Sequence, residues 1–353
     1  MNIIFHRICS LVLVLVMLLQ IAPVRSLGTE IHREHDDTEA VTQTLPTVSN
    51  SSGDAYILDE LTERRTEFTK EFLMSNGLHM AAVYDNAVHY QENGQWQEID
   101  NTLKLSAGRV GNVYTNTAGN WHVLFPQNLT PDSGISITKD EYVLSFRMSG
   151  ELRKATGGNE LMSSSGLTLN ADTDADSILN TIGTEETLSL SRPAADSPAA
   201  VIPRDTQTLL AEAEYPETVA DKIYSRLEYG DVYTNTDVIF ELSSNLVKES
   251  IVMEQFDASL RGYTYLLDTG EMTPVLSESG EILLMDEASK EPVMVMPAPY
   301  LVDNAGKYCY DVEVKLASSG DEYILSYLLP QRWLADNSRT WPVILDPEVM
   351  TSL

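Results

Sequence analysis

The stretch DVIFELSSNLVKESIVM, residues 237–253, reads as two strands joined at a turn. Apolar residues dominate both halves, and Ser243, Ser244 and Asn245 between them belong to the residue types that favour turns. Strands that are separated by turns and not by helices favour antiparallel pairing. The stretch therefore predicts an antiparallel β-sheet as the framework of the chain.

Further stretches that read as β-strands follow 237–253 up to the end of the sequence. They are GYTYLLDTG, SESGEILLMDE, EPVMVMPAPY, KYCYDVEVKL and DEYILSYLL. Together with 237–253 they define a second β region, residues 222–353. The predicted fold class is mainly β, built of antiparallel β-sandwich or meander units, and not a doubly wound α/β fold.

A first β region is predicted for residues 58–150, where aromatic residues and turn signals recur. WHVLF and EYVLSFRM supply two clear strands there, and Asn93-Gly94 within VHYQENGQWQEIDNTL (88–103) is a strong hairpin signal. The sequence leaves open whether the two β regions form one domain or two.

The start of the first β region combines two patterns. Near-helical spacing of apolar residues predicts a short helix before Arg65, and KEFLMSNGLHMAAVY after it predicts a hairpin. A further two-residue turn at Asp85-Asn86 would place Ala82 opposite His89.

Three segments flank or separate the β regions. Residues 1–26 resemble a signal peptide with cleavage after Ser26, because a short basic segment precedes an apolar run that is followed by Pro23. An uncleaved N-terminal anchor is the alternative, although the run is shorter than the roughly 20 apolar residues of a spanning helix. Residues 27–57 are predicted to be a disordered leader, and 151–221 an acidic linker rich in Ser, Thr and Ala. The expected location is secreted, with no membrane span after cleavage.

Charge and cysteine content restrict the partners. The formal net charge is −30, which repels phosphate backbones and anionic lipid, so nucleic acid is not an expected partner. Cys309 is the one cysteine left after loss of residues 1–26, which contain Cys9, so no intramolecular disulfide can form. Cys309 is expected to be a small buried hydrophobic residue and not a nucleophile.

Two sets of residues invite a metal-site interpretation. Asp172, Asp174 and Asp176 occupy alternate positions as in a calcium loop, but Ser177 and Gly183 stand where that loop needs Gly and a bidentate carboxylate. A solvated linker is therefore expected at these aspartates.

His79, His89 and His122 lie in predicted strands without a nearby cysteine or tightly spaced acid. They are expected to be half-buried, hydrogen-bonded strand residues with a structural role. We predict no catalytic, cofactor-binding or metal-binding residue and no cofactor, because the sequence also lacks the common hydrolase, metalloprotease and nucleotide-binding motifs.

Four stretches carry a family resemblance. They are RTEFTKEFLMSNGLHMAAVYDNAVHYQENGQWQEIDNTL (65–103), YGDVYTNTDVIFELSSNLVKESIVM (229–253), MPAPYLVDNAGKY (296–308) and WLADNSRTWPVILDP (333–347). In this order they resemble the N-terminal region of large secreted bacterial RHS/YD-repeat and DNRLRE-domain proteins of the wall-associated type found in Firmicutes. The resemblance implies that Asp346-Pro347 closes an N-terminal module, after which a DNRLRE domain or a repeat array would be expected. The chain would then be either a fragment of a longer protein or a copy that lacks the repeats.

These observations lead to one expectation and two alternatives. The expectation is a non-catalytic, secreted cell-envelope module, not an enzyme, which serves as a presentation or assembly segment. Its partners would be wall or surface components or downstream domains of the same polypeptide. One alternative is a carbohydrate-binding module exposing Trp96, Trp121 or Trp333, although Trp96 fits a core position better. The other is a hydrolase with an acidic pair in a cleft between the two β regions.

Overall fold

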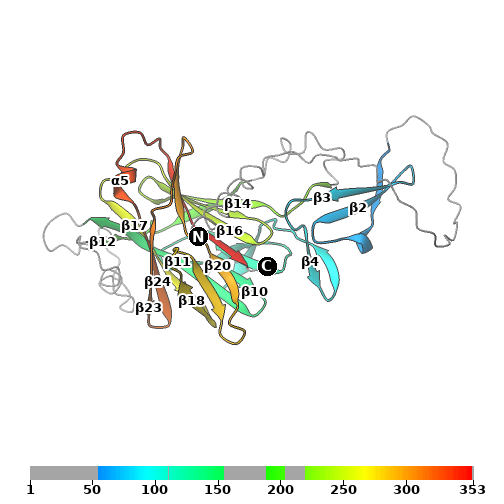
Figure 1. The fold of residues 1–353 in the computed structure, drawn as a ribbon, viewed down its shortest axis with the longest axis horizontal. Helices are drawn as coiled ribbons and strands as arrows, with labels where there is room; N and C mark the ends of the chain where they lie inside the picture. Colours follow the sequence, from blue (N-terminus) through cyan, green and yellow to red (C-terminus); the bar gives the residue numbers. More distant parts are fainter. Residues whose placement is uncertain (1–54, 110, 155–187, 203–218, 352–353) are drawn as a thin grey trace, which may run out of the picture. The chain divides into compact units, whose positions relative to one another are not determined.

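The computed structural model describes residues 55–109, 111–154, 188–202 and 219–351. The fold is mainly β with antiparallel sheets, as predicted (Figure 1). The chain divides into unit 1 (Met1–Gln97 and Arg204–Asp221) and unit 2 (Glu98–Pro203 and Lys222–Leu353). The predicted signal peptide, residues 1–26, and most of the leader 27–57 lie outside the described residues.

Unit 1 contains a three-stranded sheet and a hairpin. The sheet has the order β1-β2-β3, and a short 3-10 helix, η1, precedes Arg65 as predicted. Asn93 and Gly94 both have positive φ, 52° and 76°, as a type I′ turn requires, so the hairpin of β4 and β5 is confirmed. The bounds are β1 Ile57–Glu60, η1 Thr62–Arg64, β2 Thr69–Met74, β3 His79–Val83, β4 His89–Glu92 and β5 Gln95–Glu98.

The predicted turn at Asp85-Asn86 is wrong. β3 pairs with β2, and β4 pairs with β5, so Ala82 does not face His89. The backbone amides of Val88 and His89 instead donate to the carbonyl oxygen of Glu67, at 2.9 and 3.2 Å. These bonds hold the start of β4 against the segment before β2.

One sheet of unit 2, sheet I, has the strand order β23-β24-β17-β11-β10-β8-β7-β6, with β12 also paired to β11. It joins strands from both predicted β regions, because β11 pairs along its length with β17 (Figure 1). The bounds are β6 Lys104–Gly108, β7 Gly111–Thr115, β8 Trp121–Pro126, β10 Ile135–Lys139, β11 Tyr142–Lys154, β12 Leu188–Ser191, β17 Leu260–Asp268, β23 Glu313–Ser319 and β24 Glu322–Leu328.

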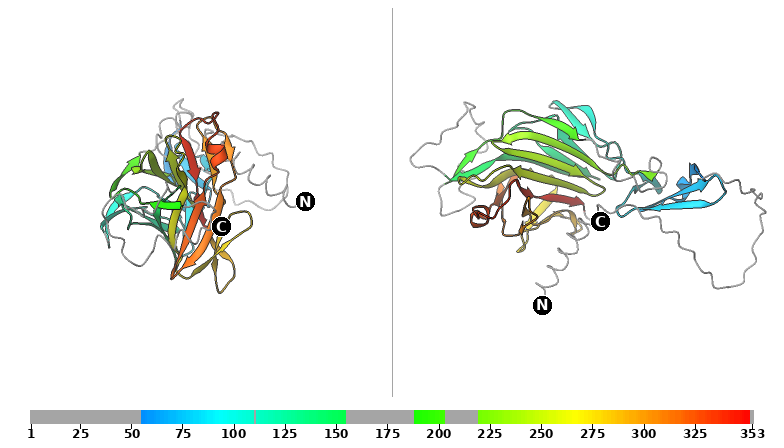
Figure 2. Two further views of the ribbon diagram at one scale, coloured as in Figure 1. Left: turned by 90° about the vertical axis from the view of Figure 1, so that its left-hand side faces the viewer. Right: turned by 90° about the horizontal axis from the view of Figure 1, so that it is seen from above.

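The other sheet, sheet II, has the order β18-β19-β20-β26-β16-β15-β14-β13-β9, and β25 joins it through β16 and β21. In Figure 2, β14, β15 and β16, in green to yellow, run side by side. The bounds are β9 Asn128–Leu129, β13 Ser197–Ile202, β14 Ser225–Tyr233, β15 Thr236–Leu242, β16 Leu246–Met253, β18 Met272–Leu276, β19 Ile282–Asp286, β20 Pro292–Met296, β21 Tyr300–Asp303, β22 Tyr308–Cys309, β25 Val343–Asp346 and β26 Glu348–Thr351. One short helix, α5 (Gln331–Leu334), follows β24.

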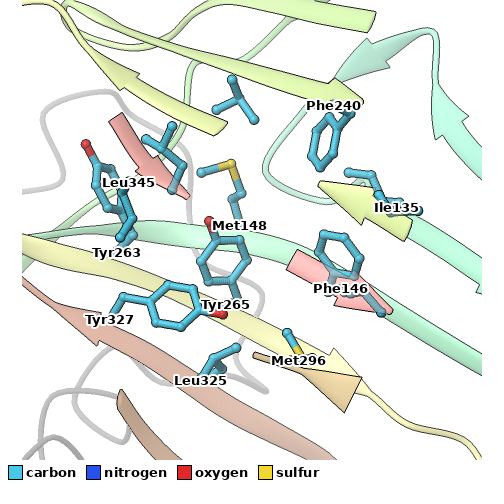
Figure 3. Close-up of a cluster of buried hydrophobic side chains, with 14 of the residues drawn as sticks. Ile135, Phe146, Met148, Phe240, Tyr263, Tyr265, Met296, Leu325, Tyr327 and Leu345 are labelled. Atoms are coloured by element: carbon cyan, nitrogen blue, oxygen red, sulfur yellow. The ribbon is translucent and has the colours of Figure 1, made fainter. Parts of the chain in front are cut away.

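The two sheets of unit 2 share one hydrophobic core. Phe240 of sheet II packs against Phe125 and Phe146 of sheet I, with ring centroids 5.4 and 6.4 Å apart. Tyr263, Tyr265 and Tyr327 of sheet I contribute further large buried side chains to this core (Figure 3). Residues 188–202, inside the segment predicted to be a linker, supply β12 to sheet I and β13 to sheet II. Leu188 and Leu190 of β12 also pack against Leu152, and Ala199 of β13 packs against the main core.

Candidate functional site

Ionisable side chains gather where β16 meets β25 and β26. Lys248 Nζ lies 2.7 Å from Asp346 Oδ2, and the Tyr300 hydroxyl donates to the same oxygen. The Ser250 hydroxyl donates to Asp346 Oδ1 at 3.3 Å. Burial raises the pKa of Asp346, although Lys248 and the hydrogen bonds oppose this shift. Asp346 therefore uses the Lys248 ammonium as its counter-ion.

Glu249 lies next to this ion pair but points into the sandwich core. Val247, Glu249 and Ile251 alternate along β16 and are all buried, so the strand period places Glu249 on the inner face. The Tyr265 hydroxyl of sheet I donates to Glu249 Oε2 at 3.1 Å. Burial and, to a smaller extent, the charge of Asp346 raise the pKa of Glu249 to about 8, against the opposing effect of the Tyr265 hydrogen bond. Glu249 is therefore mostly protonated at neutral pH.

Glu348, the first residue of β26, is the third carboxyl group of the cluster. It pairs with Lys248 in the β16–β26 ladder and is 6% exposed. Burial and the neighbouring Asp346 raise its pKa to about 7, against the opposing effect of Lys248. Glu249 and Glu348 both line a cavity of about 10 Å³, and the Oε1 atom of each has no hydrogen-bond partner. Figure 3 shows further side chains that line this cavity, Phe146, Tyr265, Met296, Leu325 and Tyr327.

A polar pocket of about 180 Å³ lies at another place in unit 2. The Arg153 guanidinium bonds Glu151 Oε2 at 2.6 Å, Asp257 Oδ2 at 2.6 Å and Ser259 Oγ at 2.9 Å. Although burial opposes it, hydrogen bonds from Ser259 and Arg153 lower the pKa of Asp257 to about 2. This arrangement ties the end of β11 to the loop between β16 and β17, and its guanidinium is already engaged by two carboxylates.

The structure does not bring the three histidines together. His89 is buried and its Nδ1 lies 2.6 Å from the Thr66 carbonyl oxygen, and burial lowers its pKa. His79 is exposed, with Nδ1 3.8 Å from Glu71 Oε2. His122 is exposed on β8 in unit 2. The histidines thus occupy separate environments, and none of the three is half-buried, so that expectation from the sequence is wrong.

The remaining residues considered for metal binding or nucleophilic chemistry are three aspartates and Cys309. Asp172, Asp174 and Asp176 lie outside the described residues. Over 55–109, 111–154, 188–202 and 219–351, no three His, Cys, Asp or Glu side chains are grouped so that they could hold a metal ion. Cys309 is buried, as predicted, and burial raises the pKa of its thiol.

Among residues 55–109, 111–154, 188–202 and 219–351, no helix has the length and apolar character needed to cross a membrane.

The tryptophans do not form an exposed platform. Trp121 is 1% exposed and belongs to the core of unit 2. Trp96 and Trp333 are half-buried, and the Arg339 guanidinium covers the Trp333 ring at 3.9 Å from its centroid.

The acidic-pair hydrolase hypothesis required two convergent carboxyl groups with perturbed pKa values. Glu249 and Glu348 have raised pKa values, but they face a cavity of about 10 Å³, which is the size of a single water molecule and not of a substrate. Alternation along β16 was the signal that could have placed Glu249 in the core. No local pattern marks Glu348.

Comparison with known proteins identifies long relatives. No family model matches the chain. It is 24% identical over 371 residues to the tRNA3(Ser)-specific nuclease WapA of Bacillus spizizenii and 23% identical over 368 residues to the tRNA(Glu)-specific nuclease WapA of Bacillus subtilis subsp. natto. It is also 23% identical over 371 residues to the tRNA nuclease WapA of Bacillus subtilis. Each alignment covers 99% of this chain and 13% of the relative, so the chain spans about one eighth of their length.

A solved structure also matches. A mutant of the heparan sulfate lyase HepC from Pedobacter heparinus has a TM-score of 0.32 and 9% identity, and the match covers 74% of this chain and 38% of that one. A likeness at this level carries no argument about the fold or function of this chain.

The relatives overturn three expectations from the sequence. The chain was expected to be a non-catalytic envelope module or a carbohydrate-binding module, not to be an enzyme, and to have no nucleic acid among its partners. Three proteins that align with nearly the whole chain are named as tRNA nucleases, which contradicts all three expectations. The exclusion of nucleic acid rested on the charge of this chain, and the other two expectations rested on its lack of catalytic motifs and on the family resemblance, whereas the names describe proteins about eight times as long.

Proposed function

We propose that this chain works as part of an exported, wall-associated tRNA nuclease similar to the WapA proteins. The observation that carries the proposal is the extent of the similarity, which runs along 99% of the chain in three nucleases. Because the chain aligns with 13% of each relative, the RNA-cleaving reaction is proposed for the whole protein and not assigned to residues of the sandwich. The apolar run at residues 1–26 supports export.

Two further features support the wall-associated part of the proposal. The stretches that resemble RHS/YD-repeat and DNRLRE-domain proteins include 229–253 and 333–347, which form β14 to β16 and β25 in sheet II. These segments supply core residues of unit 2, such as Phe240, Ile251 and Leu345, so the resemblance concerns the residues that specify the fold. The core also gives the protein stability without a disulfide.

The experiment that tests the nuclease proposal is an activity measurement on the native protein. Antibody raised against the folded chain would capture the product from culture medium, wall extract and cytoplasm, and each captured sample would be incubated with total tRNA. We expect cleaved tRNA, with defined ends by RNA sequencing, in the medium or wall sample. Duplex DNA of similar length and an extract depleted by the same antibody are the controls. Intact tRNA in every captured sample, while an added ribonuclease still cleaves it, would contradict the proposal.

A further inference from the structure

The polar pocket of about 180 Å³ in unit 2 is lined by a buried carboxylate that has an unused oxygen. Glu151 is 1% exposed and lines this pocket. The Arg153 guanidinium donates to Glu151 from Nε at 2.9 Å and from Nη2 at 2.6 Å, and both bonds end on Oε2. Within the described part of the chain, Oε1 of Glu151 has no hydrogen-bond partner. Because buried carboxylate oxygens normally accept hydrogen bonds, Glu151 has an acceptor left for a ligand in the pocket.

The other charged groups of the pocket are already paired. Arg153 Nη1 donates to Asp257 Oδ2 at 2.6 Å, and the amide and hydroxyl of Ser259 both donate to Asp257 Oδ1 at 2.7 Å. Both oxygens of Asp257 are therefore engaged. Two carboxylates neutralise the one guanidinium, so an anion in the pocket would meet an excess of negative charge. The ligand that suits the free oxygen of Glu151 is a hydrogen-bond donor.

The charge of the pocket favours a cationic donor. The charged side chains that line it are two carboxylates and one guanidinium, which leaves a formal excess of one negative charge. A buried carboxylate is stabilised when a cation and a hydrogen bond reach it together. The whole chain carries a net charge of −30, which also attracts a cation from a distance. A primary ammonium group meets these requirements, because it carries one positive charge and three donors.

The walls of the pocket also suit an alkyl chain. Met253, Phe256 and Leu260 line it with apolar surface, and Phe256 is 41% exposed. Methylene groups pack on such surface, and an aromatic ring attracts an ammonium group that lies over its face. A cavity of about 150 Å³ holds a ring of six carbon atoms, so this pocket has room for a chain of similar size. We propose that the pocket binds a primary alkylammonium group, either of a lysine side chain or of a free amine, with Glu151 Oε1 as its acceptor.

Backbone contacts hold the pocket open for its ligand. The amide of Glu254 donates to the carbonyl oxygen of Asn235 at 3.0 Å and joins the β14–β15 turn to the segment after β16. The amide of Lys154 donates to the carbonyl oxygen of Ser259 at 2.7 Å and joins the end of β11 to the segment before β17. Because these segments are already ordered, the ligand pays little for arranging the site.

Nuclear magnetic resonance of the full chain, with labelled methionine methyl groups, tests this site. Met253 lines the pocket, whereas Met294 is buried in the core away from it. Pentylammonium would be titrated, with 1-pentanol as the neutral ligand of the same size. We expect a saturable shift of the Met253 methyl signal with a Kd roughly in the millimolar range and no shift of the Met294 signal. Pentanol should bind at least about tenfold more weakly.

A lysine that is acetylated at its amino end and amidated at its carboxyl end distinguishes the two sources of the ammonium group. Tighter binding of this capped lysine than of pentylammonium would support the proposal and assign the pocket to a lysine side chain of a peptide. Weaker binding of the capped lysine would support it and assign the pocket to a free amine.

Three variants locate the binding. Glu151→Gln keeps the side-chain shape but removes its charge, and we expect at least about tenfold weaker binding of pentylammonium. Phe256→Ala covers the case in which Glu151→Gln does not fold, since Phe256 is largely at the surface, and it should weaken binding about threefold. Tyr310→Ala is the matched control, because Tyr310 is an exposed aromatic residue that does not line the pocket. This control should bind as the unaltered chain does.

Several results would overturn the proposal. They are a Met253 signal that does not move, equal binding of pentanol and pentylammonium, or an affinity that Phe256→Ala leaves unchanged. Equal weakening in Phe256→Ala and Tyr310→Ala would also overturn it, because the cation would then be bound by the acidic surface in general. None of these readouts involves cleavage of tRNA, so failure of this proposal is distinct from failure of the nuclease proposal.

Discussion

The Tyr265 hydroxyl donates a 3.1 Å hydrogen bond to Glu249 Oε2 and so joins sheet I to sheet II through a polar contact inside an apolar core. An aliphatic pair would fill this space without desolvating a carboxyl group. The contact therefore makes the stability of the sandwich depend on the protonation of Glu249.

Glu249→Gln should make the chain more resistant to unfolding at alkaline pH. The folded-state pKa is raised to about 8, so the folded state binds the proton more tightly than the unfolded state. The stability associated with this proton is present below the unfolded pKa of about 4.5 and is lost as pH rises through 8. Urea unfolding at pH 5 and pH 9 should show a gain of roughly a few kcal/mol for the variant at pH 9 only. A gain of equal size at pH 5 would contradict this explanation.

Tyr265→Phe should destabilise the chain, whereas Tyr233→Phe should not. Tyr265→Phe removes the donor to Glu249 and leaves that carboxyl group buried without a protein partner, which should cost about 1–3 kcal/mol. The Tyr233 hydroxyl is buried and has no hydrogen-bond partner, so its removal should be neutral or slightly stabilising. The unfolding temperatures of the two variants would be measured at pH 6. Equal destabilisation would contradict the prediction, because ring packing and not hydrogen bonding would then determine both effects.

Lys248→Met should destabilise the chain strongly. The variant leaves Asp346, which is 3% exposed, without its cation while the methionine keeps most of the side-chain volume. Breaking a buried ion pair from one side typically costs about 3–5 kcal/mol. The loss of unfolding free energy should become smaller as the pH is lowered and Asp346 is protonated. Chemical unfolding at pH 4 and pH 7 measures this free energy, and a loss that does not depend on pH would assign the effect to packing.

Gly262→Ala should disrupt the pairing of β17 and β24. A Cβ at this position would lie 2.1 Å from the backbone carbonyl oxygen of Tyr327, so the two strands would have to separate. We expect a loss of at least about 3 kcal/mol or failure to fold. Gly230→Ala is the control, because its Cβ would meet only Asp237 Oδ1 at 3.9 Å. Circular dichroism and thermal unfolding of both variants give the measurement.

Much of the strand content could be predicted from the sequence because turns and alternation are local signals. The Asn93-Gly94 turn, the β15–β16 hairpin and the 3-10 helix before Arg65 all lie within short windows. The pairing of β11 with β17 could not be predicted, since nothing in either strand specifies its partner. β12 (LSLS) and β13 (SPAAVI) were not predicted because they are short runs within a segment rich in Ser, Thr, Ala and Pro, and pairing with β11 and β14 sets their conformation.

The candidate site was less predictable than the fold. Glu249 follows a lysine and precedes a serine, a context that reads as solvent-exposed, and only its alternation with Val247 and Ile251 indicates burial. The three histidines attracted attention as chemically versatile residues, but each lies in a separate environment. The relationship to tRNA nucleases could not be inferred from the charge of −30, because that charge belongs to the aligned part and not to the whole relatives.

The pairing of β11 with β17 also sets the order in which the chain can fold. Ser149 of β11 and Thr264 of β17, whose hydroxyl groups are 3.4 Å apart, are separated by 115 positions in the sequence. During synthesis β11 therefore emerges long before its partner and presents an unpaired, apolar strand edge until β17 arrives. The central part of sheet I can close only after β17 has been synthesised, so the nascent chain passes through a period in which this strand edge is open to aggregation.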